Sequence, residues 1–159
     1  MIVGISGCGK STIGAALARQ NNWRFLEGDD FHLPDNIKKM ASGTGLTDSD
    51  RRAWTTAIAQ AIDARTEATL VLACSALTPF VRNQLDQTLG SAIYIHFSTQ
   101  AVNMGERLTK RDHFMPAELL PSQRASLSVP RGAYEFDASK APDEIIARIM
   151  DQRRHLRLA

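Results

Sequence analysis

Residues 4–12 read GISGCGKST, which fits the pattern G-x-x-x-x-G-K-[ST] of a phosphate-binding loop. Glycines in such a loop allow positive φ angles and let the backbone approach a phosphate. The backbone N–H groups then form an anion site at the positive end of the helix that follows. Lys10 can reach the β- and γ-phosphates, and the Ser11 hydroxyl can ligate Mg²⁺. The stretch predicts a nucleoside triphosphate site made of Gly4, Ser6, Gly7, Cys8, Gly9, Lys10, Ser11 and Thr12.

The stretch could be a phosphate-binding loop or a glycine-rich turn that matches the pattern by chance. The neighbouring residues favour the phosphate-binding loop. Residues 1–3 are apolar and residues 13–18 have a helix-like composition. A strand, a glycine loop and a helix in succession are the context that the motif requires. The first strand has only three residues before Gly4, so either it is short or the natural start lies upstream.

Length and composition point to one globular domain spanning residues 1–159. Hydrophobic residues make up 43%, charged residues 23%, and the net charge of +2 gives no sign of a nucleic-acid footprint. Two cysteines, Cys8 and Cys74, do not make a disulfide framework and favour a reducing compartment. The sequence shows no signal peptide and no apolar run long enough to span a membrane. We expect a cytoplasmic protein that binds neither membranes nor nucleic acid.

Apolar runs alternate with helical patterns along the chain. The expected strands are 1–3, 23–26, 69–74, 92–97 and 133–137. The expected helices are 13–20, 35–41, 47–62, 78–89, 98–111, two short pieces within 112–129, and one from Pro142. This alternation predicts a three-layer α/β fold, with a central parallel five-stranded sheet and helices on both faces. Ala53, Trp54, Ala57, Ile58, Ala61 and Ile62 form the expected core stripe of the third helix, so Trp54 is interpreted as core.

Asp29 is the leading candidate for acid–base chemistry. It follows the second strand at the edge where α/β sheets bind ligands. There it can orient or deprotonate an acceptor hydroxyl and contact Mg²⁺ through water, with Glu27 or Asp30 assisting. The alternative is a solvated aspartate in a turn, which is common.

Cationic and neutral donors are expected to gather around the phosphates and the acceptor. Arg107 and Arg111 lie four residues apart on one helix face and could clamp a transferring phosphate from a mobile lid. Without such a role, they would be a basic helix end that the helix dipole favours. Further donors, each a surface residue by default, are His32, Lys39, Arg52, Arg82 and His113.

Taken together, these residues resemble the gluconokinases of the P-loop kinase group over nearly the whole chain. The succession G-D-x-x-H, N-x-x-K-M and G-x-x-L-x-D-x-D-R-x-x-W is far more specific than the phosphate loop alone. The shared stretches are GISGCGKST, GDDFH from Gly28, NIKKM from Asn36, SGTGLTDSDRRAW from Ser42, CSAL from Cys74 and HFMPAELLPSQ from His113.

The resemblance implies ATP-dependent phosphorylation of D-gluconate at its 6-hydroxyl, with Mg²⁺. It also implies a fold like that of shikimate and nucleoside monophosphate kinases, a helical lid at about 109–128, and a homodimer. Asp29 matches the acceptor-side carboxylate of the family, and Lys10 and Arg107 would neutralise the developing charge with help from Arg111. The implied gluconate and phosphate contacts are His32, Lys39, Arg52, Arg82, His113 and Gln123.

The chain departs from the family pattern around CSAL and in the lid. These departures leave two alternatives open: a kinase of another small sugar acid or polyol, and a nucleotide-binding module that no longer transfers phosphate. The intact Gly28-Asp29 and His32 argue against the second, because a module that only binds needs no acceptor base. The positions concerned are Thr78, Val81, Asn83, Asp112 and Ser128.

Overall fold

The computed structural model describes residues 1–64, 66–90, 92–98 and 115–157. Within these residues the core is a five-stranded sheet in the order β2-β3-β1-β4-β5, and every pairing is parallel. The strands are β1 (Ile2–Val3), β2 (Arg24–Glu27), β3 (Leu70–Ala73), β4 (Ile95–Ser98) and β5 (Tyr134–Asp137). Chain order reverses at the central β1, and such a switch point is where open α/β sheets bind ligands.

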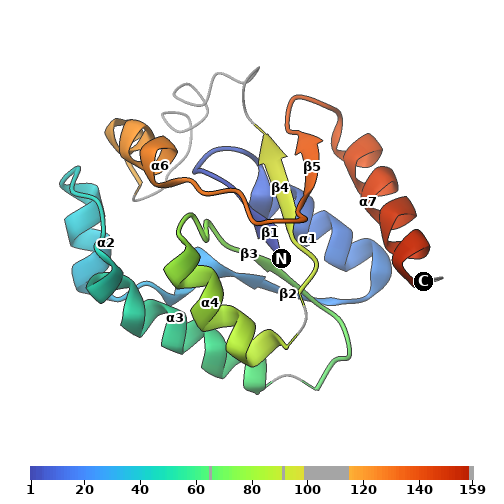
Figure 1. Cartoon of the computed structure of the whole chain (residues 1–159), viewed down its shortest axis with the longest axis horizontal. Coiled ribbons are helices and arrows are strands. Elements are labelled where there is room, and N and C mark those ends of the chain that lie inside the picture. Colours follow the sequence, from blue (N-terminus) through green and yellow to red (C-terminus); the bar gives the residue numbers. More distant parts are fainter. Residues whose placement is uncertain (65, 91, 99–114, 158–159) are drawn as a thin grey trace.

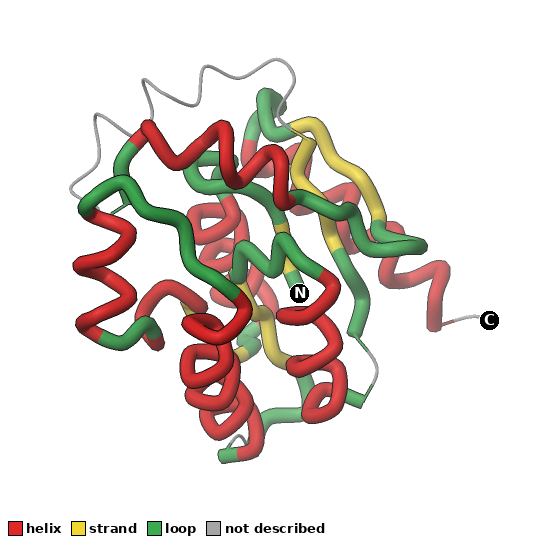
Figure 2. The backbone as a smooth tube through the Cα atoms, turned by 60° about the vertical axis from the view of Figure 1, so that its left-hand side comes forward, coloured by secondary structure: helices red, strands yellow, loops and turns green. Residues whose placement is uncertain are grey.

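Helices cover both faces of the sheet (Figures 1 and 2). The α-helices are α1 (Lys10–Asn21), α2 (Pro34–Ala41), α3 (Asp48–Asp63), α4 (Pro79–Leu89), α6 (Leu120–Ser126) and α7 (Pro142–Arg157); 3₁₀ turns are η1 (Gly28–Phe31) and η2 (Ala117–Leu119). Helices α1 and α7 lie on one face, α3 and α4 lie on the other, and α2 and α6 lie at one end of the molecule (Figure 1). The predicted fold class is confirmed.

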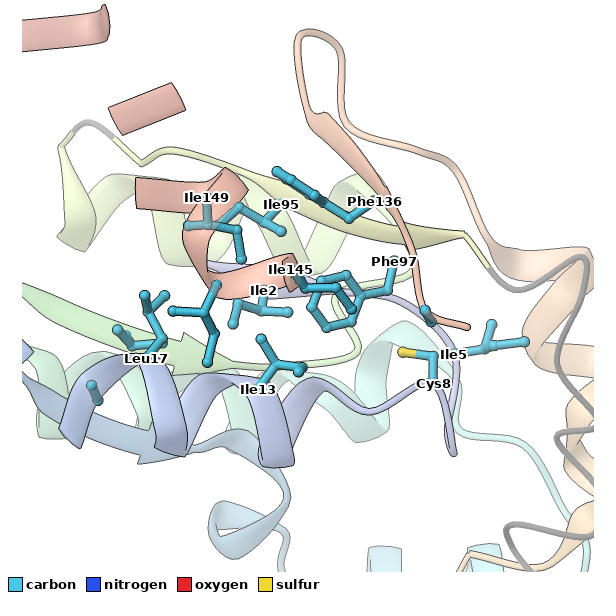
Figure 3. Packing of buried hydrophobic residues seen from close by; sticks show 14 of the residues in the cluster. Ile2, Ile5, Cys8, Ile13, Leu17, Ile95, Phe97, Phe136, Ile145 and Ile149 are labelled. Carbon is cyan, nitrogen blue, oxygen red and sulfur yellow. The ribbon is translucent and has the colours of Figure 1, made fainter. Parts of the chain in front are cut away.

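Two apolar clusters hold these layers together, one on each face. Ile13 and Leu17 of α1 meet Ile145 and Ile149 of α7 above strand residues such as Phe97 (Figure 3). On the other face Trp54, Ile58 and Ile62 of α3 pack against α4 and the strands, and all three are at most 2% exposed.

One member of the predicted core stripe is wrong. Ala53 is exposed, and Thr55 is buried instead. The reason is the phase of α3, whose buried side is centred on Trp54, Ile58 and Ile62.

Local capping chemistry explains the starts of α3 and α4. Thr47 and Asp50 form the predicted capping box at the start of α3. Thr78 caps α4, with Pro79 in its first turn and Gly90 at its C-cap. These predicted boundaries are confirmed.

The predicted strand 92–97 begins later than expected. Its ladders with β1 and β5 both start at Ile95. Before it, the Tyr94 carbonyl oxygen still accepts a 2.9 Å hydrogen bond from the Tyr134 N–H of β5. The irregular stretch before β5 contains η2 followed directly by α6, which confirms two short helical pieces. The predicted helix 98–111 lies outside the described residues, and the domain bounds 1–159 with a lid at 109–128 stay a prediction. In the described part of the chain, no helix has the length and apolar composition that crossing a membrane requires.

Candidate active site

The phosphate loop runs from the central strand β1 into α1. Three of its glycines have positive φ: Gly4 at 145°, Gly7 at 80° and Gly9 at 95°. At Gly4 a β-carbon would lie only 3.0 Å from the Cys8 sulfur, which is itself buried in the core. Glycine at this position therefore provides both the backbone conformation and the space beneath the loop.

The start of α1 is arranged as an anion site. Gly9 is its N-cap, and no side chain of the described residues caps the helix. Free N–H groups at the first turn are available to an anion. Lys10 is 7% exposed, and its ammonium donates to the Ile5 carbonyl oxygen at 3.1 Å. The Lys10 ammonium is thus held at the backbone of the phosphate loop.

Glu27 and Ser11 supply hard oxygen atoms beside this loop. Burial raises the pKa of Glu27, while a hydrogen bond from Ser11 and the charge of Lys10 partly offset the rise. Hydroxyl and carboxylate oxygens are the ligands that Mg²⁺ prefers, with phosphates and water completing its coordination. The hydroxyl of Ser11 and the carboxylate of Glu27 therefore fit Mg²⁺. Two other residues predicted for this site, Thr12 and Asp30, are exposed.

Asp29 lies in η1, directly after β2. Its carboxylate is 22% exposed, and Oδ1 lies 4.0 Å from His32 Nε2. The His32 ring stacks on Trp54, with the ring centroids 4.4 Å apart and an interplanar angle of 13°. Trp54 is a core residue, as predicted. Its stacking also holds the orientation of the His32 ring beside Asp29.

Gly28 allows η1 to lie close to both Trp54 and the end of β3, because glycine has no β-carbon. The Gly28 carbonyl oxygen accepts a 2.7 Å hydrogen bond from Trp54 Nε1, and the residue lies against Ala73, the last residue of β3, and Cys74. A β-carbon at Gly28 would lie 2.9 Å from the Ala73 carbonyl oxygen. Because that neighbour is backbone, it cannot move aside cheaply.

Gly28→Ala is therefore expected to destabilise the protein by about 1–3 kcal/mol, the usual cost of overpacking. A fall in melting temperature would measure it. Gly45→Ala is the matched control, because its β-carbon would meet nothing closer than Ser122 Oγ at 3.8 Å. An unchanged melting temperature in Gly28→Ala would contradict this account of Gly28.

A pocket of about 250 Å³ lies between the phosphate loop, η1, α3, the loop after β3, and α6. Apolar side chains, including Met40, Leu77 and Val81, line part of it. The polar residues along its wall include Ser6, Asp29, His32, Arg51, Ser75 and Gln123.

The arginine in this pocket is Arg51, which the sequence prediction missed. Its guanidinium pairs with Asp48 at 2.8 Å, and its side chain is 17% exposed. Arg52, the predicted contact, is exposed, stacks over the Phe80 ring at 5.3 Å, and is not among the described lining residues. Within D-x-D-R-x-x-W the arginine directly follows Asp50, so the motif itself marks Arg51.

Two other predicted donors are engaged within the protein. Lys39 Nζ lies 2.6 Å from Asp50 Oδ2, and this contact holds the pKa of Asp50 well below its usual range. Arg82 is 8% exposed and donates to the carbonyl oxygens of Ala76 at 2.8 Å and Leu77 at 3.2 Å. Neither is among the described residues that line the pocket.

Arg82 also reaches the chain beyond α6. Its Nη2 donates to Ser128 Oγ at 3.2 Å, and the Ser128 N–H donates to the Leu77 carbonyl oxygen at 2.9 Å. Ala76, held between these bonds, has an unusual positive φ of 40°. Arg82 therefore fixes the loop whose residues Ser75 and Leu77 line the pocket.

Gln123 lies at the junction of the pocket and the phosphate loop. Its side-chain amide binds Ser6, and the residue is 8% exposed. Arg107, Arg111 and His113 fall outside the described residues, so their predicted roles stay predictions.

Comparisons with known proteins identify the family of the chain. A family model described as an AAA domain matches residues 1–156. The gluconokinase of Gluconobacter oxydans is 36% identical over 156 residues, which cover 94% of this chain and 88% of that protein. The chain belongs to the gluconokinase family. The predicted resemblance is thereby confirmed.

Solved structures support the family and the fold. A gluconokinase from Sinorhizobium meliloti matches this chain with a TM-score of 0.79 and 34% identity. The match covers 98% of this chain and 94% of the S. meliloti chain. Shikimate kinase from Aquifex aeolicus has a TM-score of 0.61 at 14% identity, covering 99% and 97%, and shows the fold alone.

The departures from the gluconokinase pattern take different positions in the structure. Thr78 caps α4, Asn83 is exposed, and Ser128 binds Arg82. Val81, 1% exposed, faces the pocket and can affect its shape directly. Asp112 lies outside the described residues.

Proposed function

We propose that this chain transfers the γ-phosphoryl group of ATP to the 6-hydroxyl of D-gluconate, giving 6-phospho-D-gluconate and ADP. The observation that carries the proposal is the adjacency of a pocket, whose wall includes Asp29, His32 and Arg51, to Ser6 of the phosphate loop. The gluconokinase names of its relatives, bacterial and eukaryotic, favour gluconate over another sugar acid or polyol.

The pocket suits a small, hydroxyl-rich anion. Its volume of about 250 Å³ lies below the range of about 300–1,000 Å³ usual for small-molecule sites. Arg51 offers a planar guanidinium to a carboxylate. Ser75 and His32 offer groups that can hydrogen-bond hydroxyls.

Asp29 is the proposed acceptor-side base. A carboxylate that is one-fifth exposed can accept the proton of a bound hydroxyl and orient its oxygen toward the phosphate. His32, held against Trp54, lies beside this carboxylate and would contact gluconate.

The phosphate loop provides charge neutralisation. Phosphoryl transfer has a loose transition state, so catalysis rests on positioning and on charge stabilisation. Backbone N–H groups of residues 4–12 would hold the phosphates. The Lys10 ammonium, which has three donors, would contact them while it keeps its hydrogen bond to the Ile5 carbonyl oxygen. Arg107 and Arg111 are the further cations that we propose.

Mg²⁺, when bound, would neutralise negative charge on the phosphate oxygens. Ser11 would be its protein ligand, and Glu27 and Asp29 would contact it through water. We further propose, from the family resemblance, a cytoplasmic homodimer that acts on a small molecule, without nucleic-acid or membrane partners.

Arg51→Ala is expected to raise the KM for gluconate about tenfold or more, because a charge-assisted hydrogen bond contributes about 1.5–3 kcal/mol. Arg52→Ala is the matched control, and it is expected to leave KM within about twofold because exposed groups contribute little. Steady-state kinetics with gluconate as the varied substrate measures both. Equal effects, or a larger effect in Arg52→Ala, would contradict the placement of the carboxylate at Arg51.

The proposed function is tested by release of ADP from MgATP over a panel of acceptors. The panel contains gluconate, other sugar acids, polyols, shikimate and nucleoside monophosphates. Gluconate is expected to be the preferred acceptor. Preference for another acceptor would redirect the proposal toward that substrate, and ATP binding without release would favour a non-catalytic module.

A further inference from the structure

Gln123 on α6 binds the phosphate loop at a single residue, Ser6. The Ser6 N–H donates to Gln123 Oε1 at 2.8 Å, and Gln123 Nε2 donates to Ser6 Oγ at 3.0 Å. Both residues are 8% exposed, and 117 positions separate them in the sequence. One amide therefore satisfies both the donor and the hydroxyl acceptor of one loop residue.

The peptide unit between Ile5 and Ser6 is held from both sides. Its N–H donates to Gln123, and its carbonyl oxygen accepts the 3.1 Å hydrogen bond from Lys10 Nζ. Gly4 and Gly7 flank this unit, with φ angles of 145° and 80°. Glycines leave a backbone many accessible conformations, so the orientation of this peptide depends on what binds it.

The other end of the contact belongs to the acceptor pocket. Gln123 Nε2 also lies 3.4 Å from Met115 Sδ. Met115 packs with Leu119 and Met40 in a small buried cluster, and all three residues line the pocket. The wall that an acceptor would touch is thus connected through Gln123 to the peptide that holds Lys10.

We propose that Gln123 is a positioning residue that couples the acceptor pocket to the phosphate loop: it fixes the Ile5–Ser6 peptide and, through it, Lys10. The proposal rests on the proposed function for the identity of the acceptor. An acceptor that orders the pocket wall then orders the loop, and linkage requires that it raise the affinity for nucleotide. If Gln123 only stabilised the fold, its replacement would not change the effect of the acceptor on nucleotide affinity.

The test measures the Kd of a non-hydrolysable ATP analogue with Mg²⁺, with and without saturating gluconate. In the wild type, gluconate is expected to tighten nucleotide binding about fivefold or more, the lower limit of typical coupling between sites. Gln123→Asn keeps the amide but is one methylene too short to hold Ser6, and Gln123→Leu removes the amide. In both, the effect of gluconate is expected to fall below about twofold.

Gln60→Leu, at an exposed position of α3, is the matched control and is expected to keep the full coupling. Ser6→Ala removes the hydroxyl that accepts from the amide. If Gln123 acts through Ser6, the single variant Ser6→Ala will show weaker coupling than the wild type. The double variant Ser6→Ala/Gln123→Leu will show the same coupling as Gln123→Leu alone.

Full coupling in a folded Gln123→Asn protein would overturn the proposal, as would its absence from the wild type. Turnover of gluconate by the wild type separates the two claims. Turnover without coupling removes only the role of Gln123, whereas no turnover with gluconate removes the proposed function.

Discussion

Asp29→Asn is expected to lower kcat for gluconate phosphorylation about 10²- to 10⁴-fold, the usual contribution of a positioned acid–base group. Asparagine has nearly the same shape as aspartate but cannot accept the proton of the acceptor hydroxyl. The side chain lies in the pocket beside His32 and does not belong to the phosphate loop. The Kd for MgATP is therefore expected to change little.

Asp30→Asn is the matched control for this variant. Asp30 is the next residue in η1 and is exposed, and the described pocket lining does not include it. Single-turnover kinetics, together with nucleotide titration, measures transfer and binding separately. Unchanged transfer in Asp29→Asn would remove Asp29 from the mechanism.

Lys10→Ala is expected to reduce transfer about 10²- to 10³-fold with any acceptor, as is usual when a charge-stabilising donor is removed from a reacting centre. The variant removes the buried ammonium that is bound to the Ile5 carbonyl oxygen. Nucleotide affinity should fall as well, because the lysine binds phosphates in the ground state and in the transition state.

Lys38→Ala provides the control for charge. Lys38 is 80% exposed on α2, where it pairs with Asp35. Nucleotide titration and ADP release are expected to be close to wild type in this variant. A fully active Lys10→Ala protein would contradict the assignment of the phosphate loop.

The sequence predicted best what short stretches determine. The phosphate loop, the capping box of Thr47 and Asp50, and the start of α4 at Thr78 each depend on residues within a few positions. Backbone chemistry at these places requires particular residue types. The parallel sheet with helices on both faces follows from apolar runs that alternate with helical patterns, whereas the strand order β2-β3-β1-β4-β5 was not predicted.

Arg51 could have been found from helical phase. It lies three residues before Trp54, so it is on the same side of α3 as the buried stripe. Arg52 lies two residues before Trp54 and is turned away from that side. The predicted core stripe, applied to the arginines, would therefore have identified the pocket residue.

Other contacts depend on chain segments that the sequence alone does not bring together. Gln123 and Ser6 are 117 residues apart, and Arg82 and Ser128 are 46 apart. The family resemblance indicated Gln123 and Arg82 as contacts of substrate or phosphate, but their partners within the protein follow from the tertiary fold. Lys39 similarly finds Asp50, eleven residues away, once α2 and the start of α3 are placed.

The central claim is that gluconate is phosphorylated at its 6-hydroxyl. The most direct measurement incubates the protein with MgATP and gluconate and oxidises the product with 6-phosphogluconate dehydrogenase. We expect one 6-phosphogluconate to form for each ADP released. ADP release without a product that this dehydrogenase oxidises, or no ADP release with gluconate at all, would contradict it.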